Sequence, residues 1–360
     1  MWDKQTGMII HQRSPFNAET PRGVLQEFIT PVTAFYSRNH GPIPEVDGQS
    51  WHLKVAGRVA HPRTFTFDEL THGFDVHAIT ATLQCAGNRR AGLAAVRAIP
   101  GEDPWGQGAT STAEWRGARL ADVLAAVGAT DDDRLHVGFH APDVSPMATP
   151  PQEYGSSIPM TKASRSEVLL ALGMNCQPLP RIHGGPVRVV VPGYIGARSV
   201  KWVTGITVDD RPSDNYFQSS AYRILPPDAD PDAAPPGDGI ALSSLALNCD
   251  FLSHSDGDRV PDGPITVGGY ALAGDQRGIA RVDVSLDDGS TWSQADLEPV
   301  SSRWAWRHWS FAFCVRTGPL RLTARAFDDT AATQPETAAA LWNPTGYANN
   351  SWARLSLDVS

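Results

Sequence analysis

The chain has 360 residues, and its 30 basic and 39 acidic side chains give it a formal net charge of −9 at neutral pH. An acidic chain of this kind is not expected to bind nucleic acid or an anionic membrane through a general basic surface. The length exceeds that of one ordinary hydrophobic core, so we expect two domains.

The N-terminal segment, MWDKQTGMIIHQRSPF, lacks the apolar core of a secretory signal peptide. The rest of the chain contains no run of about 18 apolar residues, the length that spans a bilayer as a helix. We therefore expect a cytoplasmic protein without a membrane span, or a periplasmic one if the N-terminus has been trimmed.

The first part of the chain mixes strand and helix patterns without the regular spacing of β-α-β units. We expect strands at 51–59, 134–140 and 187–192, and a helix at 119–128 that Gly128 ends. Ser164 and Glu167 have the spacing of a capping box, which predicts a helix through EVLLALG (167–173). These patterns indicate an α+β domain.

The segment 226–239, PPDADPDAAPPGDG, is rich in Pro and Asp and has no periodicity. Such a composition is typical of a linker or surface loop. We therefore place a first domain at 1–240 and a second at 241–360.

The sequence patterns of the second domain predict an all-β fold. An apolar strand is expected at 265–274, a hairpin at 279–292 with its turn at Asp288-Gly289, and a further strand at 320–327. An aromatic strand at 303–313 has the composition of either an interface or an ordinary core. Short strands at this spacing predict an immunoglobulin-like sandwich.

Four cysteines lie far apart, at positions 85, 176, 249 and 314, without the spacing of a zinc site. We expect the last three to be buried free thiols. Cys85 differs, because it ends an apolar run in TLQCAGNRR (82–90) and two arginines follow it. Neighbouring cations predict a lowered thiol pKa.

Basic groups also gather beside glycines, in Arg38-Asn39-His40, in 181–188 and in 198–201. Arginine presents a planar fork of donors that suits phosphates and other oxyanions. Together with Cys85 these clusters predict a bound anionic cofactor. The residues alone leave two roles for the thiolate, either a nucleophile or a metal ligand whose cofactor brings the remaining donors.

Several segments resemble the sulfite oxidase family of molybdenum enzymes, in order from about residue 30 to the C-terminus. They are FYSRNHGPIP (35–44), TLQCAGNRR (82–90), YGSSIP (154–159), PRIHGGPVRVVVPGYIGARSVKW (180–202), SDNYFQSSAYRI (213–224) and WNPTGYANNSW (342–352). The resemblance implies a molybdopterin-binding α+β domain followed by a dimerisation domain, and hence a homodimer.

The resemblance also implies a role for each matching residue. Cys85 is expected to ligate molybdenum, with two further sulfurs coming from the pyranopterin dithiolene. The residues expected to hold the molybdopterin and its phosphate are Tyr36, Ser37, Arg38, Asn39, His40, Asp143, His183, Arg188, Ser199, Val200 and Lys201. Those expected at the substrate are Arg38, Arg90, Trp105 and Tyr222.

The reaction implied is oxygen-atom transfer that converts sulfite to sulfate, with electrons passing to a separate carrier such as cytochrome c or oxygen. The segment 342–346 departs from the family, because Thr345 stands where sulfite-oxidising members carry a third substrate arginine. Reduction of nitrate or a similar oxyanion with an external donor is therefore an alternative. A cofactor-free anion-binding protein is a third.

Overall fold

The computed structural model describes residues 2–360. It begins with a hairpin of β1 (Ile9–Arg13) and β2 (Phe16–Glu19), followed by the 3-10 helix η1 (Arg22–Gln26). The α-helices of the described chain are short: α1 (Phe67–His72), α2 (Arg90–Ala94), α3 (Leu120–Ala126), α4 (Met160–Ala163) and α5 (Tyr216–Ser219). Among residues 2–360, no helix is both long and apolar enough to cross a membrane.

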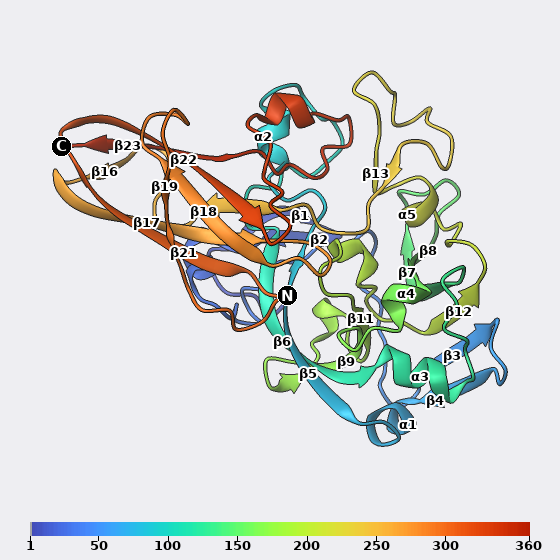
Figure 1. The fold of residues 1–360 in the computed structure, drawn as a ribbon. Helices are drawn as coiled ribbons and strands as arrows, with labels where there is room; N and C mark the ends of the chain where they lie inside the picture. Colours follow the sequence, from blue (N-terminus) through green and yellow to red (C-terminus); the bar gives the residue numbers. More distant parts are fainter. Residues whose placement is uncertain (1) are drawn as a thin grey trace.

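Two five-stranded sheets form the first part of the chain (Figure 1). One has the order β10-β9-β6-β5, with β11 also pairing with β9. Its strands are β5 (Val76–Gln84), β6 (Thr110–Arg119), β9 (Leu169–Met174), β10 (Gln177–Pro178) and β11 (Arg188–Val190). The other has the order β4-β3-β12-β7-β8, with β3 and β12 parallel. Its strands are β3 (His52–Gly57), β4 (Arg63–Thr66), β7 (His136–Ser145), β8 (Gln152–Pro159) and β12 (Gly205–Asp209).

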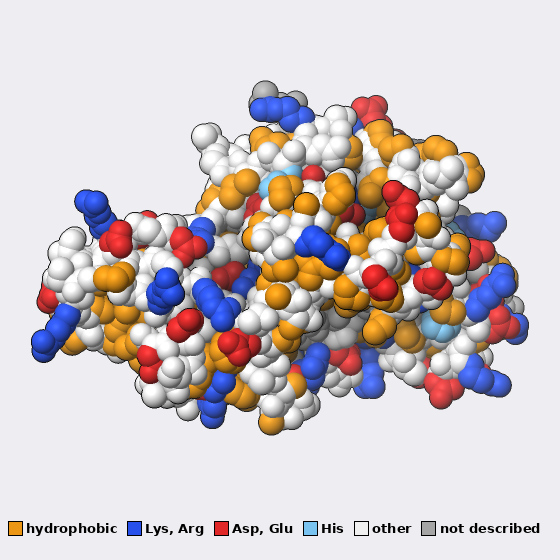
Figure 2. Space-filling model, turned by 90° about the horizontal axis from the view of Figure 1, so that it is seen from above, with side chains coloured by type: hydrophobic (Ala, Val, Ile, Leu, Met, Phe, Trp, Pro, Cys, Tyr) orange, Lys and Arg blue, Asp and Glu red, His pale blue; other side chains and the backbone are white. Residues whose placement is uncertain are grey.

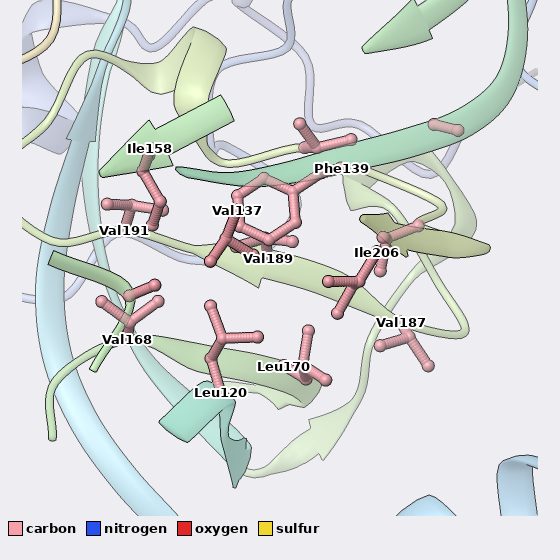
Figure 3. Packing of buried hydrophobic residues seen from close by; sticks show 14 of the residues in the cluster. Leu120, Val137, Phe139, Ile158, Val168, Leu170, Val187, Val189, Val191 and Ile206 are labelled. Atoms are coloured by element: carbon pink, nitrogen blue, oxygen red, sulfur yellow. The ribbon is translucent and has the colours of Figure 1, made fainter. Parts of the chain in front are cut away.

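Apolar side chains from both sheets interlock in one core (Figure 3). Val137 and Phe139 of β7 and Leu170 of β9 are fully shielded from solvent there. Leu120, the first residue of α3, packs in the same cluster. The helix ends as predicted, with Gly128 following at φ +68°, a conformation that a residue with a Cβ adopts at a cost. The predicted strands at 51–59, 134–140 and 187–192 are confirmed.

The predicted helix at 164–173 is wrong. Glu167 does not cap a helix, because its carboxylate binds Lys162 Nζ at 2.6 Å. Residues Leu169–Met174 instead form β9, which pairs with β6 on one side and with β10 and β11 on the other. A strand inside a sheet that is covered on both faces reads as a continuous apolar run, which periodicity does not separate from a buried helix.

The second part of the chain is a β-sandwich, the lobe drawn in orange and red in Figure 1. One sheet has the order β15-β17-β21-β20, built from β15 (Asn248–Phe251), β17 (Gly263–Leu272), β20 (Asp296–Leu297) and β21 (Arg307–Val315). The other has the order β16-β23-β22-β18-β19, built from β16 (Asp258–Val260), β18 (Ile279–Ser285), β19 (Ser293–Gln294), β22 (Gly318–Asp328) and β23 (Ala353–Val359).

The hairpin predicted at 279–292 is confirmed, since β18 pairs with β19 and both Asp288 and Gly289 have positive φ. The aromatic strand begins later than predicted, at Arg307. Trp304 and Trp306 precede it and bind β5 of the first part: Thr82 N donates to Trp304 O at 2.9 Å, and Trp306 N donates to Thr82 Oγ1 at 2.8 Å. These tryptophans therefore join the two parts.

The segment between the two parts contains β13 (Arg223–Ile224) and β14 (Ile240–Ala241), which pair with each other, and otherwise runs as loop. The first hydrophobic core extends beyond this segment into the second part of the chain, where it includes Leu242, Leu272 and Tyr347.

The four cysteines form no disulfide bonds. Cys85 and Cys249 are buried, whereas Cys176 and Cys314 are exposed, contrary to prediction. Acidic and basic side chains are interspersed over the face in Figure 2, as expected for a protein without a general basic surface.

Candidate active site

A cavity of about 660 Å³, a volume that includes space open to solvent, lies in the first part of the chain. Its wall comes from the loop 35–40, the end of β5, β7, and the stretch 182–202, which contains η2 (Arg181–His183) and η3 (Gly196–Arg198). The predicted site residues in this wall are Tyr36, Ser37, Arg38, Asn39, His40, Cys85, Asp143, His183, Arg188, Ser199, Val200, Lys201 and Tyr222. Residues far apart in the sequence thus meet around one cavity.

Cys85 lies directly after β5, where the chain leaves the sheet and turns. Its backbone N–H donates to Ala109 O at 2.9 Å, and Gly87 N–H points at its sulfur, at 3.4 Å. Burial raises the thiol pKa above its usual value, although Arg90 and Arg38 oppose the increase. The predicted low pKa is therefore wrong for the cofactor-free chain, because desolvation outweighs the two arginines.

Two basic side chains in the wall, those of Arg188 and Lys201, are bonded to oxygen atoms of the chain. Arg188 is buried and donates to His183 O at 2.9 Å and to Ser199 O at 3.0 Å. Lys201 Nζ donates to Arg38 O at 3.0 Å and also to Asn39 Oδ1. Since these partners are carbonyl oxygens, the bonds orient both cations without neutralising them.

The N-terminal segment adds another cation. Lys4 Nζ lies 2.8 Å from His183 Nε2 and donates to Val32 O at 3.1 Å and Phe35 O at 2.7 Å. Burial lowers its pKa to about 7, and burial together with Lys4 and Arg188 lowers the pKa of His183 well below its usual value. Burial likewise lowers the pKa of Lys201 well below its usual value.

The wall fits an anionic, hydrogen-bonding group such as the expected pyranopterin and its phosphate. Ser37 Oγ and Asp143 Oδ1 are buried without a hydrogen-bond partner in residues 2–360. Unpaired buried polar atoms and uncompensated buried cations each cost free energy, and a bound anion with donor and acceptor edges removes both costs. Burial raises the pKa of Asp143 to about 7, so this carboxyl can donate a hydrogen bond near neutral pH.

No group of three or more His, Cys, Asp or Glu side chains in residues 2–360 is arranged to hold a metal ion. Cys85 supplies one sulfur. A metal at Cys85 therefore needs donors that a cofactor brings, which agrees with the second of the two roles left open by the sequence.

Tyr222 and His40 face each other in the wall near Cys85. His40 Nε2 lies 2.5 Å from Tyr222 Oη, and Tyr222 also stacks on Tyr347 of the second part, with ring centroids 5.3 Å apart. Burial and the charge of Arg38 lower the pKa of His40 well below its usual value, so this imidazole is neutral. Burial raises the pKa of Tyr222, which therefore keeps its proton.

Arg90 and Trp105 lie behind the wall rather than in it. Arg90 Nη1 binds Glu102 Oε2 and Asp103 O, each at 2.9 Å, and Nε donates to Gly346 O at 3.2 Å. Its guanidinium packs on Gly87, where a Cβ would lie 2.6 Å from Nη2. Trp105 is fully buried, and its indole N–H has no partner in the described chain.

Arg89 points the opposite way from Arg90, at φ +64°. Its Nη1 donates to Asn248 Oδ1 and Ser351 O, both at 2.9 Å, and its Nε lies 3.1 Å from Asp250 Oδ2. These partners belong to the second part of the chain. The turn that carries Cys85 is therefore anchored on the β-sandwich.

Several residues near the site were missed by the sequence analysis, among them Tyr154, Trp202 and Lys4. Tyr154 and Trp202 line the cavity, and both lie inside segments that the resemblance covers, so closer attention to those segments could have found them. Lys4 lies outside the resemblance, and nothing in its local sequence marks it.

Two family models match the chain: "Oxidoreductase molybdopterin binding domain" over residues 40–217, and "Mo-co oxidoreductase dimerisation domain" over residues 242–360. The protein named mitochondrial sulfite oxidase of Mus musculus is 41% identical over 97% of this chain, and the chain spans only 65% of that protein. Sulfite oxidase of Arabidopsis thaliana is 38% identical over 97% of this chain and 93% of the plant protein. The structure of the sulfane dehydrogenase SoxCD from Paracoccus pantotrophus matches with a TM-score of 0.81 and 27% identity, over 97% of this chain and 88% of that one.

Proposed function

Because this chain belongs to the sulfite oxidase family of molybdenum oxidoreductases, we propose that it oxidises sulfite to sulfate. The observation that carries the proposal is the buried Cys85 in the wall of a cavity that Arg38, Arg188 and Lys201 also line, since none of these three forms a salt bridge with a carboxylate in residues 2–360. The net reaction adds the oxygen of one water to sulfite and releases two protons and two electrons. The molybdenum cofactor, when bound, supplies the two-electron redox chemistry, whereas the protein binds the cofactor, orients the substrate and adjusts the electronic properties of the metal.

In this proposal the cavity holds the cofactor through complementary charge. Arg188, Lys201 and His183 would hold the phosphate, and Ser37 and Asp143, whose polar atoms lack partners in residues 2–360, would pair with polar atoms of the pterin. Cys85 Sγ gives up its proton when it binds the metal, which makes metal binding dependent on pH.

Arg38 and Tyr222 orient the substrate on the Cys85 side of the cavity. We assign the tautomer of His40 in which Nε2–H donates to Tyr222 Oη, because this leaves the phenol proton free to donate to a substrate oxygen. A charge-assisted bond from Arg38 and a neutral one from Tyr222 then fix two oxygens of a small oxyanion.

We also propose a homodimer and a separate one-electron acceptor. Support for the dimer is the match of residues 242–360 to a dimerisation domain. Light scattering at several protein concentrations tests it. The acceptor is inferred from the net reaction, because two electrons must leave the site in each turnover.

Reduction of nitrate or a similar oxyanion is the second candidate, and Thr345 favours it. A threonine supplies no charge where sulfite-oxidising members carry arginine, and its hydroxyl is bonded to Asn343 Oδ1 at 3.0 Å and Arg223 O at 3.3 Å. Loss of this positive charge lowers the affinity of the site for a dianion relative to its affinity for a monoanion.

Metal analysis followed by two steady-state assays tests the proposal. We expect one molybdenum per chain, rapid reduction of cytochrome c with sulfite, and little oxidation of a reduced dye with nitrate. Molybdenum-loaded protein that turns over nitrate but not sulfite would reverse the order of the two candidates. Protein that folds but binds no molybdenum would refute both.

A further inference from the structure

Glu102 is the carboxylate beside Arg90. It lies in the loop 100–108 between α2 and β6, and Oε2 is 2.9 Å from Arg90 Nη1. Its side chain is 19% exposed, whereas that of Arg90 is 2% exposed, so the pair lies at the boundary between solvent and interior. The loop is held in place because Glu19 accepts from Gly106 N at 2.5 Å and from Gly108 N at 3.0 Å.

The ion pair lies close to Cys85. The guanidinium of Arg90 packs on Gly87, two residues after the cysteine. Burial raises the pKa of Tyr222 and the carboxylate of Glu102 adds to that increase, so the field of Glu102 extends to the phenol across the site. Glu102 and Arg90 do not line the cavity, so their charges act on the Cys85 side of it from behind the wall.

The charged side chains on the Cys85 side of the cavity partly cancel one another. Arg38 and Arg90 are positive, Glu102 is negative and bonded to Arg90, Asp103 adds a second carboxylate that acts on Arg38, and Thr345 is neutral. The carboxylate of Glu102 therefore removes about one unit from the positive charge that the two arginines would otherwise exert on a ligand, with Arg90 acting from behind the wall. A site with this charge gains less from a dianion than its arginines suggest.

We propose that Glu102 is a specificity-determining residue, which neutralises Arg90 and thereby shifts the site toward singly charged oxyanions such as hydrogen sulfite. This inference rests on the proposed function, since it concerns the substrate end of that same site. Glu102 itself does not touch the substrate; it acts through the charge of Arg90.

Glu102→Gln tests the inference, because glutamine keeps the size and a hydrogen bond to Arg90 but removes the charge. Sulfate (a dianion) and nitrate (a monoanion) are titrated calorimetrically into the oxidised holoenzyme without turnover. Since the Coulomb energy scales with ligand charge, the gain for sulfate should be about the square of that for nitrate. We expect roughly 3-fold tighter nitrate and roughly 10-fold tighter sulfate at low ionic strength, with both gains shrinking as salt is added.

The matched control is Glu69→Gln, which removes a carboxylate from an exposed pair with Arg63 (2.7 Å) and should leave both affinities unchanged. Glu102→Asp retains the charge and should keep the wild-type ratio, whereas Glu102→Ala should repeat the shift. Equal gains for both anions, or none, would overturn the proposal. So would loss of molybdenum or of the fold in both charge-removing variants, since Glu102 would then be a structural residue.

The experiment is independent of turnover. A wild-type enzyme that fails to oxidise sulfite, combined with a shifted sulfate-to-nitrate ratio in Glu102→Gln, would refute the proposed function and retain the role of Glu102.

Discussion

Lys162 and Glu167 form a buried ion pair whose two halves should depend strongly on each other. Their charged atoms are 2.6 Å apart, and their side chains are only 4% and 9% exposed. Removing one partner of such a pair leaves an uncompensated buried charge and costs about 3–5 kcal/mol, whereas replacing both by apolar side chains is often neutral. We expect Lys162→Met to destabilise by about 3–5 kcal/mol, a large fraction of the roughly 5–15 kcal/mol of a typical protein.

The double variant Lys162→Met/Glu167→Leu should recover most of that loss, to within about 1 kcal/mol of wild type. Glu167→Gln should cost less than Lys162→Met, because the glutamine oxygen can still accept the hydrogen bond that Lys162 Nζ donates to Glu167, whereas methionine leaves Glu167 without a donor. Burial already lowers the pKa of Lys162, and removing Glu167 lowers it further, so the unfolded state binds more protons and the stability of Glu167→Gln should rise with pH. Urea unfolding at pH 6 and pH 9 measures these differences. Single variants within about 1 kcal/mol of wild type, without coupling, would refute the reasoning.

Three further predictions concern the site. Cys85→Ser should fold but fail to turn over sulfite, because a hydroxyl is a poorer ligand for a sulfur-rich metal centre; near-normal activity in metal-loaded protein would remove the ligand assignment. Without cofactor, the N-terminal segment should dock more tightly as the pH rises from about 7 toward the usual lysine pKa, since the detached Lys4 binds more protons than the docked one in this range. Hydrogen exchange of residues 2–7, corrected for intrinsic rates, measures the docking, and Lys4→Met should abolish the pH dependence. Thr345→Arg should lower the KM for sulfite and strengthen inhibition by sulfate, with the gain falling as salt is raised; an unchanged KM and inhibition in metal-loaded protein would place Thr345 outside the pocket.

Much of the fold could be predicted because local signals agreed with the tertiary structure. Gly128 ends α3 at positive φ, and Asp288-Gly289 turns the hairpin, since these residues tolerate conformations that others avoid. The failure at 164–173 has a tertiary cause. The carboxylate that would cap a helix is taken by Lys162, and the apolar run after it fills a sheet with two covered faces.

The candidate site likewise has features that could be predicted from the sequence and features that depend on the tertiary structure. The resemblance to the sulfite oxidase family indicated most of the residues that gather around the cavity, although Arg90 and Trp105 lie behind its wall. The thiol pKa of Cys85 could not be predicted, since it depends on how far burial outweighs Arg90 and Arg38. Lys4 and Glu102 depend on contacts between segments far apart in the chain, which no local pattern records. The roles of the individual site residues, the division at residue 240 and the immunoglobulin-like topology stay predictions.

The contacts of Arg89 make the two parts of the chain depend on each other. Arg89 binds Asn248, Asp250 and Ser351, so the position of the turn after Cys85 depends on a β-sandwich more than 150 residues further along the chain. A cut within 226–239 would separate two pieces of ordinary domain size, yet it would leave the first piece without the contacts that hold the turn after Cys85. Fusions and rearrangements during evolution could therefore add segments before or after this pair of domains, but they could not exchange one half of the pair freely.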